Sequence, residues 1–196
     1  MDGNHASLVV HSIEQSIAVK QALLAGKELV NLIGMVGDAF VTALAGGHKI
    51  LLFGNGGSAA DAQHIAAEFV GRFQKERPPL PALALTVDTS ALTCIGNDYG
   101  YEHVFARQVT ALGLEGDVAV GISTSGNSLN VVKGLAAARA GGLVTVALTG
   151  QNRGGMGEQA QYCISVPSDV TARIQEAHIL IGHILCEIVD AKLGSG

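Results

Sequence analysis

The stretch Leu51-Leu-Phe-Gly-Asn-Gly-Gly-Ser-Ala-Ala-Asp-Ala-Gln-His-Ile-Ala-Ala-Glu68 decides the fold of this chain. Its apolar start predicts a buried strand, and its glycines predict a tight turn after the strand. The residues from Ser58 onward predict a helix. This order places backbone N–H groups and the positive end of a helix dipole at the strand's end, an arrangement that suits an anion. His64 and Glu68 are four residues apart and so lie side by side on that helix. A phosphate cradle beside an acid/base or metal pair indicates chemistry on a small phosphorylated molecule.

The remainder of the chain alternates short apolar runs with helical patterns. This alternation predicts βαβ units and a parallel sheet covered by helices on both faces. At 196 residues the chain is expected to form one domain, with a helical N-terminal segment at 5–46 and an α/β core at 48–192. The predicted helices cover residues 5–24, 27–45, 58–73, 102–111, 129–140 and 171–192, and Asp88 or Thr89 can cap a further short helix. The predicted strands cover residues 49–53, 82–87, 117–122, 143–148 and 162–166, and residues 96–100 are expected to form a loop.

Composition narrows the class of protein. The net charge of −5 and the scattered Lys and Arg residues argue against nucleic-acid binding. The N-terminus has no secretory signal pattern. The sequence contains no run of 18 uncharged apolar residues, so we expect no membrane span. The three cysteines sit among apolar neighbours and are expected to be buried, reduced thiols of a cytoplasmic protein. The mean hydropathy of +0.36 is high, which indicates a surplus of apolar residues. We expect part of this surplus to lie at the surface and to be covered by a subunit interface.

A second turn rich in hydroxyl groups follows the third predicted strand. Its sequence is Gly121-Ile-Ser-Thr-Ser-Gly-Asn-Ser128. Four hydroxyl groups beside the start of a helix favour a phosphate site, whereas the alternative is that a serine only caps the helix. The turn lacks the lysine of a P-loop, which argues against nucleoside triphosphate chemistry.

Together with these two turns, the segments Ile95–Gly100 and Arg173–His178 resemble the phosphoheptose isomerase family. The resemblance covers nearly the whole chain and implies the sugar isomerase (SIS) fold, a three-layer α/β sandwich with a five-stranded parallel sheet flanked by helices. It implies conversion of sedoheptulose 7-phosphate to D-glycero-D-manno-heptose 7-phosphate, a precursor for ADP-heptose and the lipopolysaccharide core. It also implies a homotetramer with sites between subunits and with the N-terminal helices in its interface.

The same resemblance assigns roles to individual residues. It implies one Zn²⁺ per subunit, bound by His64, Glu68, Gln175 and His183, with Glu68 and His183 also serving as the acid/base pair. A carboxylate bound to metal is a poorer base, so the two roles of Glu68 compete. The substrate-binding positions that it implies are Asn55, Gly56, Gly57, Glu68, Asn97, Asp98, Ser123, Thr124, Ser125, Ser128 and Gln175.

Helix geometry constrains this ligand set. Gln175 and His183 are eight residues apart, which on one helix is about 12 Å of rise and roughly 80° of rotation. Because zinc bonds are only about 2 Å long, one straight helix can hardly bring both side chains to one ion. If both residues serve one site, either different subunits supply them or the helix is irregular between them.

Two other functions remain compatible with the sequence. One is a non-catalytic SIS protein that binds a replication-initiator protein. The other is a SIS module, regulatory or etherase-like, that acts on a different sugar phosphate. The presence of Glu68, Gln175 and His183 weighs against a pure binding protein, because a scaffold does not need titratable groups such as the His64–Glu68 pair, which we expect to be buried.

Overall fold

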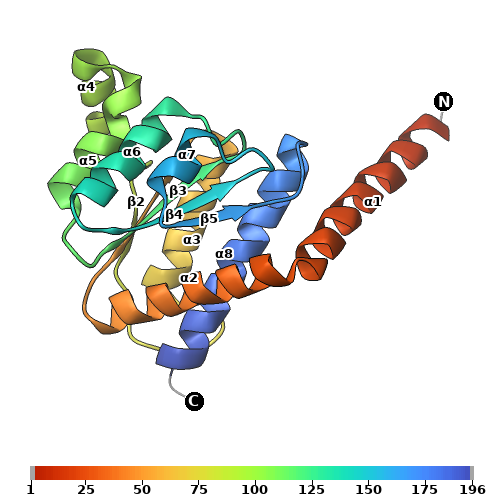
Figure 1. The fold of residues 1–196 in the computed structure, drawn as a ribbon, viewed down its shortest axis with the longest axis horizontal. Coiled ribbons are helices and arrows are strands. Elements are labelled where there is room, and N and C mark those ends of the chain that lie inside the picture. The colour runs from red at the N-terminus through yellow and green to blue at the C-terminus, as the bar shows by residue number, and fades with distance from the viewer. Residues whose placement is uncertain (1–2, 195–196) are drawn as a thin grey trace.

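The computed structural model describes residues 3–194, and a parallel sheet runs through its centre (Figure 1). Its five strands lie in the order β2-β1-β3-β4-β5, and all neighbouring pairs are parallel. This confirms the predicted five-stranded parallel sheet. The strands are β1 (Ile50–Gly54), β2 (Ala82–Ala84), β3 (Val118–Ser123), β4 (Val144–Thr149) and β5 (Tyr162–Ser165).

Helices cover both faces of the sheet, as the alternating pattern predicted (Figure 1). The cores on the two faces are separate: Phe40, Phe69 and Leu185 belong to one, and Phe53 and Phe105 to the other. The first face carries α2 (Lys27–Ala45), α3 (Gly57–Val70) and α8 (Thr171–Leu193), and the second carries α5 (Val104–Leu112), α6 (Leu129–Ala140) and α7 (Gly154–Gln159).

Central strands β1 and β3 are buried along their whole length. They pair in register from Ile50 opposite Val118 to Gly54 opposite Ile122. Because parallel strands end at the same edge, the glycine turn after β1 and the serine turn after β3 emerge next to one another. The sheet therefore brings together the two turns that the sequence singled out.

The structure corrects several local predictions. Strand β2 ends at Ala84 rather than at residue 87, and helix α3 ends at Val70 rather than at residue 73. Residues 96–100 are not a loop, because α4 (Thr89–Tyr99) continues to Tyr99 from an N-cap in which Asp88 accepts a hydrogen bond from the Ala91 N–H. Helix α7 was missed because its glycine-rich sequence has low helix propensity. The thiols were expected to be buried, but only Cys186 is fully buried; Cys163 is half-buried and Cys94 is exposed.

The first helix, α1 (Gly3–Ala25), extends away from the sheet (Figure 1). Its C-terminal end is anchored by Leu23, which is buried in the core. Large apolar side chains elsewhere on this helix are exposed in the single chain, namely Leu8, Val9, Val10, Ile13, Ile17 and Leu24.

Among the described residues, one helix has the length and hydropathy of a membrane span, namely α2. The sequence analysis expected no such segment. Helix α2 contributes Ile33, Val36 and Phe40 to the buried core on one face of the sheet. These buried positions account for one side of the helix, whereas Val30 and Met35 are exposed in the single chain.

A buried ion pair ties the end of α3 to α8. The Arg77 Nε donates to Asp190 Oδ1 at 2.8 Å, and both side chains are almost inaccessible to solvent. The Arg77 guanidinium also donates to the backbone carbonyls of Glu68 and Phe69. Burial by itself would raise the pKa of Asp190, but hydrogen bonds from Lys75, Arg77 and Gln74 and the Arg77 charge lower it overall. The pair thus anchors the helix that carries His64 and Glu68.

We expect Asp190→Asn to destabilise the protein by about 3 kcal/mol, because it leaves the Arg77 charge buried without a partner. The measurement is urea unfolding at pH 7, with the exposed Asp38→Asn as control. The pKa of Asp190 is lower in the folded state, so its contribution is present above the unfolded pKa near 3.9 and disappears as the pH falls through the lowered folded pKa. Equal stability of the two variants at pH 7 would contradict this assignment.

Candidate active site

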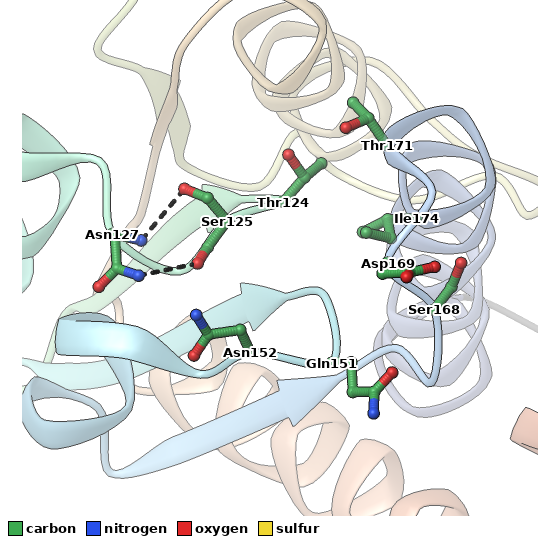
Figure 2. Close-up of a pocket in the computed structure, with 9 residues that line it drawn as sticks. All are labelled: Thr124, Ser125, Asn127, Gln151, Asn152, Ser168, Asp169, Thr171 and Ile174. Atoms are coloured by element: carbon green, nitrogen blue, oxygen red, sulfur yellow. Dashed lines mark hydrogen bonds between the residues drawn. The ribbon is translucent and has the colours of Figure 1, made fainter.

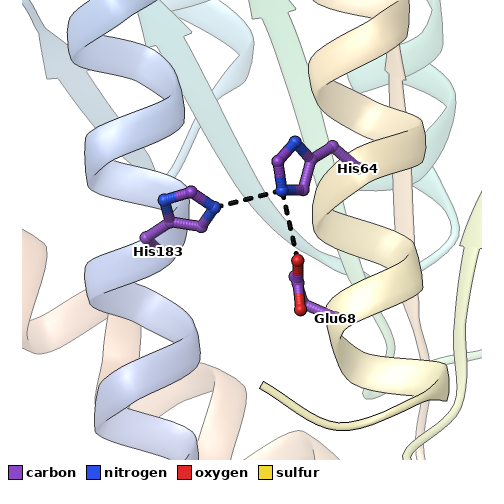
Figure 3. Close-up of side chains that lie close together, drawn as sticks. All are labelled: His64, Glu68 and His183. Atoms are coloured by element: carbon purple, nitrogen blue, oxygen red, sulfur yellow. Dashed lines mark hydrogen bonds and ion pairs between the residues drawn. The ribbon is translucent and has the colours of Figure 1, made fainter. Parts of the chain in front are cut away.

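Two histidines and a glutamate converge between α3 and α8 (Figure 3). On α3, His64 Nε2 lies 3.1 Å from Glu68 Oε1, as their i, i+4 spacing predicted. From α8, His183 Nε2 lies 3.2 Å from His64 Nε2, and the Phe73 ring stacks on His183 at 5.3 Å. In the single chain the His64 side chain is 49% exposed and that of Glu68 is 25% exposed, so the pair is less buried than expected.

The donor atoms of this cluster lie close enough together to bind one metal ion. One nitrogen from each histidine and one oxygen from Glu68 all lie within 4.8 Å of one another. Two His and one Glu are a donor set found in catalytic zinc sites, and ligands about 2 Å from a tetrahedral zinc are separated by about 3.3 Å. The separations of 3.1 and 3.2 Å match this value. The cluster is therefore a candidate metal centre that lacks a fourth ligand within it.

Gln175 lies at the other end of the α3–α8 contact, against the glycine turn. A Cβ atom at Gly57 would fall 2.9 Å from the Gln175 Cδ and still closer to its Nε2, so only glycine leaves room for this amide. Helix α8 is continuous from Thr171 to Leu193, so Gln175 and His183 remain two turns apart. Within one chain the structure thus separates Gln175 from the other three predicted metal ligands.

Three of the four hydroxyl groups in the serine turn form a connected group. Ser123 Oγ lies 2.9 Å from Ser128 Oγ and 3.3 Å from Ser125 Oγ. Ser128 is the N-cap of α6, but its side chain makes no capping hydrogen bond, so the capping alternative fails for this residue. The turn also holds the Asn127 N–H, which donates to Ser125 Oγ.

Thr124 and Ser125 face a cavity of about 590 Å³ between this turn and the start of α8 (Figure 2). Ser168 and Asp169 approach it from the segment before α8. Several lining residues were not predicted, because no local pattern shows that segments so far apart in the sequence meet. Those residues are Asn127, Gln151, Asn152, Ser168, Asp169, Thr171 and Ile174.

The remaining predicted substrate residues lie on α4 and in the glycine turn. Asn97 donates to Asp98 at 2.8 Å on the exposed end of α4, and in the described chain Asp98 is not part of the metal-type cluster. Gly56 is the N-cap of α3. Asn55 connects the two regions, because Tyr101, which follows α4, donates its hydroxyl hydrogen to Asn55 Oδ1 at 3.2 Å.

Two further titratable side chains near the site are buried to different degrees. Burial raises the pKa of half-buried Asp61, His64 partly offsets this, and Asp61 Oδ2 has no hydrogen-bond partner among the described residues. Burial lowers the pKa of His178 to about 4 although it bonds the Thr149 carbonyl. His178 is therefore neutral at pH 7, and its buried hydrogen bond to the Thr149 carbonyl gives it a structural role.

Comparison with known proteins identifies the class. The family model of the SIS domain matches residues 17–150. The chain is 58% identical over 181 residues to the phosphoheptose isomerase of Aneurinibacillus thermoaerophilus, covering 92% of this chain and 91% of that protein. It is 57% identical to the enzyme of Aquifex aeolicus, covering 90% and 91%. The solved phosphoheptose isomerase GmhA of Neisseria gonorrhoeae matches with a TM-score of 0.88 at 46% identity, covering 95% and 98%.

A parallel sheet with a hydroxyl-rich turn at its carboxyl edge and this family match define a SIS-domain protein of the sugar isomerase class. The identities of more than 50% over nearly the whole chain go further. The chain belongs to the phosphoheptose isomerase family and is an isomerase. The alternative of a non-catalytic binding protein is not supported.

We expect Gly57→Ala to lower kcat/KM about tenfold, because the added methyl group displaces the Gln175 amide from the glycine turn. The measurement is steady-state isomerase kinetics, with circular dichroism to verify the fold. The matched control is Gly155→Ala in α7, where the new Cβ meets only Val132, at ordinary contact distance. If both variants kept full kcat/KM, the contact between Gly57 and Gln175 would have no part in the site.

Proposed function

We propose that this chain interconverts sedoheptulose 7-phosphate and D-glycero-D-manno-heptose 7-phosphate through an enediol. The observation that carries the proposal is the convergence of His64, Glu68 and His183 between α3 and α8, in a chain that also gathers serine hydroxyls after β3. The names and identities of the relatives support the heptose as substrate. An isomerase for another sugar phosphate is the alternative that a substrate panel tests.

The reaction moves a proton between C1 and C2 of the open-chain sugar, and in the proposal Glu68 and His183 move it. Glu68 removes the proton from C1, which gives the enediol. His183 transfers a proton at the substrate oxygens or returns the proton to carbon. His64 holds the Glu68 carboxylate at 3.1 Å and contacts His183 at 3.2 Å, so both acid/base groups are kept at one point.

The substrate phosphate is held away from the reacting carbons, by the serine turn. Ser123, Thr124, Ser125 and Ser128 offer hydroxyl donors where α6 begins, so the helix dipole adds to the attraction for an anion. Binding energy from this remote group orients C1 and C2 toward Glu68. The other substrate contacts in the proposal come from Asn55, Gly56, Gly57, Asn97, Asp98 and Gln175.

In the proposal one Zn²⁺ per subunit is bound by His64, Glu68 and His183 together with Gln175. When bound, zinc supplies a Lewis acid that polarises the substrate oxygens. Because Gln175 lies two turns from His183 on an unbroken helix, we expect a neighbouring subunit to complete the set. The half-exposed cluster supports such a shared site.

We further propose a cytoplasmic homotetramer of single SIS domains that binds neither nucleic acid nor membrane. The exposed apolar side chains of α1 support an interface there, and an apolar groove of about 490 Å³ lies beside them between α1, α2 and α8. Leu24, Val30 and Ile184 are among the residues that line this groove. The product would serve as a precursor for ADP-heptose and the lipopolysaccharide core.

We expect Glu68→Gln to lower kcat about a thousandfold with little change in thermal stability, because an amide of the same shape is not a base. The assay follows aldose formation from sedoheptulose 7-phosphate. Glu158→Gln in α7 is the matched control and should keep the parent rate. Near-normal turnover by Glu68→Gln would end the assignment of Glu68 as the base.

Chelator treatment of the parent enzyme tests the metal. We expect turnover to disappear after treatment and to return with added Zn²⁺, since three of the proposed ligands are already in place. Turnover that persists after complete removal of metal would refute the zinc proposal. No turnover in either state, from a folded oligomer, would refute the proposed reaction.

We expect Ile13→Asp and Ile17→Asp to dissociate the tetramer, because each places a charge on the exposed apolar side of α1. Sedimentation equilibrium and activity are measured on the same samples. Leu114→Asp makes the same change at an exposed loop position away from α1 and should leave the assembly intact. A monomer that keeps full activity would refute the shared site.

A further inference from the structure

Two asparagine side chains bond to one another between the glycine turn and the serine turn. Asn55 immediately follows β1, and Asn130 is the second residue of α6. Asn55 Nδ2 donates to Asn130 Oδ1 at 2.9 Å, and Asn130 Nδ2 donates to Asn55 Oδ1 at 2.8 Å. Asn130 is 4% exposed, whereas Asn55 is only half-buried and borders the site.

The backbone decides which way both amides face. The Val131 N–H points at Asn130 Oδ1 from 3.0 Å, in a bond that it shares with the Ser128 carbonyl. If the Asn130 amide were reversed, its NH₂ group would face this N–H, donor against donor. The oxygen of Asn130 is therefore fixed, and the nitrogen of Asn55 must face it.

Counting hydrogen bonds shows what remains available on Asn55. An asparagine amide has two N–H donors and one oxygen with two lone pairs. The Asn55 oxygen accepts from Asn130 Nδ2 and from the Tyr101 hydroxyl, which uses both lone pairs. One N–H is bonded to Asn130, and the described part of the chain provides no acceptor for the other.

We propose that Asn55 meets the substrate only as a donor, through this second N–H, and that Asn130 is the positioning residue that holds it in that orientation. The acceptor is an oxygen of the sugar phosphate. This inference rests on the proposed function, because it assumes that a sugar phosphate occupies the site. Asn130 itself touches no substrate and acts through Asn55.

Substrate binding tests the proposal without depending on turnover. Sedoheptulose 7-phosphate is titrated calorimetrically into the Glu68→Gln protein, which does not turn the substrate over, and into the same protein carrying Asn55→Ala, Asn130→Leu or both changes. We expect Asn55→Ala to weaken binding about thirtyfold, the loss of a hydrogen bond to a charged group. Asn130→Leu should weaken it nearly as much, because the freed amide no longer points its N–H at the substrate. The double variant should bind no more weakly than Asn55→Ala alone.

Asn55→Asp tests the donor role, because a carboxylate keeps the shape and the acceptor but has no N–H. We expect it to bind substrate at least as weakly as Asn55→Ala. Binding close to that of the unchanged side chain would show that the substrate uses the Asn55 oxygen, and would overturn the proposal.

Two further results would also refute it. One is unchanged binding by a folded Asn130→Leu protein, and the other is a multiplicative loss in the double variant, which would mean that the two residues act independently. Thermal unfolding of every variant shows whether the fold is intact, and Asn130→Ala, which also removes the amide but adds no apolar bulk, replaces Asn130→Leu if the latter does not fold. Failure of the parent protein both to bind and to isomerise the heptose would refute the proposed function instead.

Discussion

The contact between α3 and α8 is the constraint on which the site depends. A Cβ atom at Gly182 would fall 2.7 Å from the Ile65 Cγ1, so the two helices approach as closely as they do only because α8 has a glycine there. His183 follows this glycine and His64 precedes Ile65. This close approach thus lies next to the point where the two imidazole rings meet. Further along, Arg77 pairs with Asp190 on α8 and bonds the backbone carbonyls at the end of α3, which holds the same two helices together.

The sheet supplies the other half of the arrangement. Because β1 and β3 are neighbours and parallel, the glycine turn and the serine turn emerge side by side although about 70 residues separate them in sequence. Asn55 and Asn130 connect these two turns by a pair of hydrogen bonds. The two turns are therefore held rigidly at one edge, and α3 runs from the glycine turn to His64 and Glu68, which suits a reaction that needs a fixed distance between the phosphate and C1.

Local patterns predicted the strands and helices well because each element has a clear apolar period, capping residue or glycine turn. The sequence predicted α6 at its observed bounds and the i, i+4 pair of His64 and Glu68. The errors fell where local preference is weak or overridden, at the glycine-rich α7 and at the end of α4. Contacts such as Tyr101 with Asn55, and Arg77 with Asp190, join distant segments and have no signature in either segment alone. The roles of the predicted site residues remain predictions.

The two edges of the sheet are short, and this has a consequence for how the chain meets copies of itself. Edge strand β2 has three residues and follows Pro81, and edge strand β5 has four. A short edge beside a proline offers few free backbone groups to a strand from another molecule. Growth of the sheet into a larger one is thereby discouraged at both sides. Contact with another copy would then use helix surfaces, where side-chain shape rather than backbone pairing selects the partner. The fold therefore favours specific association over open-ended pairing of strands.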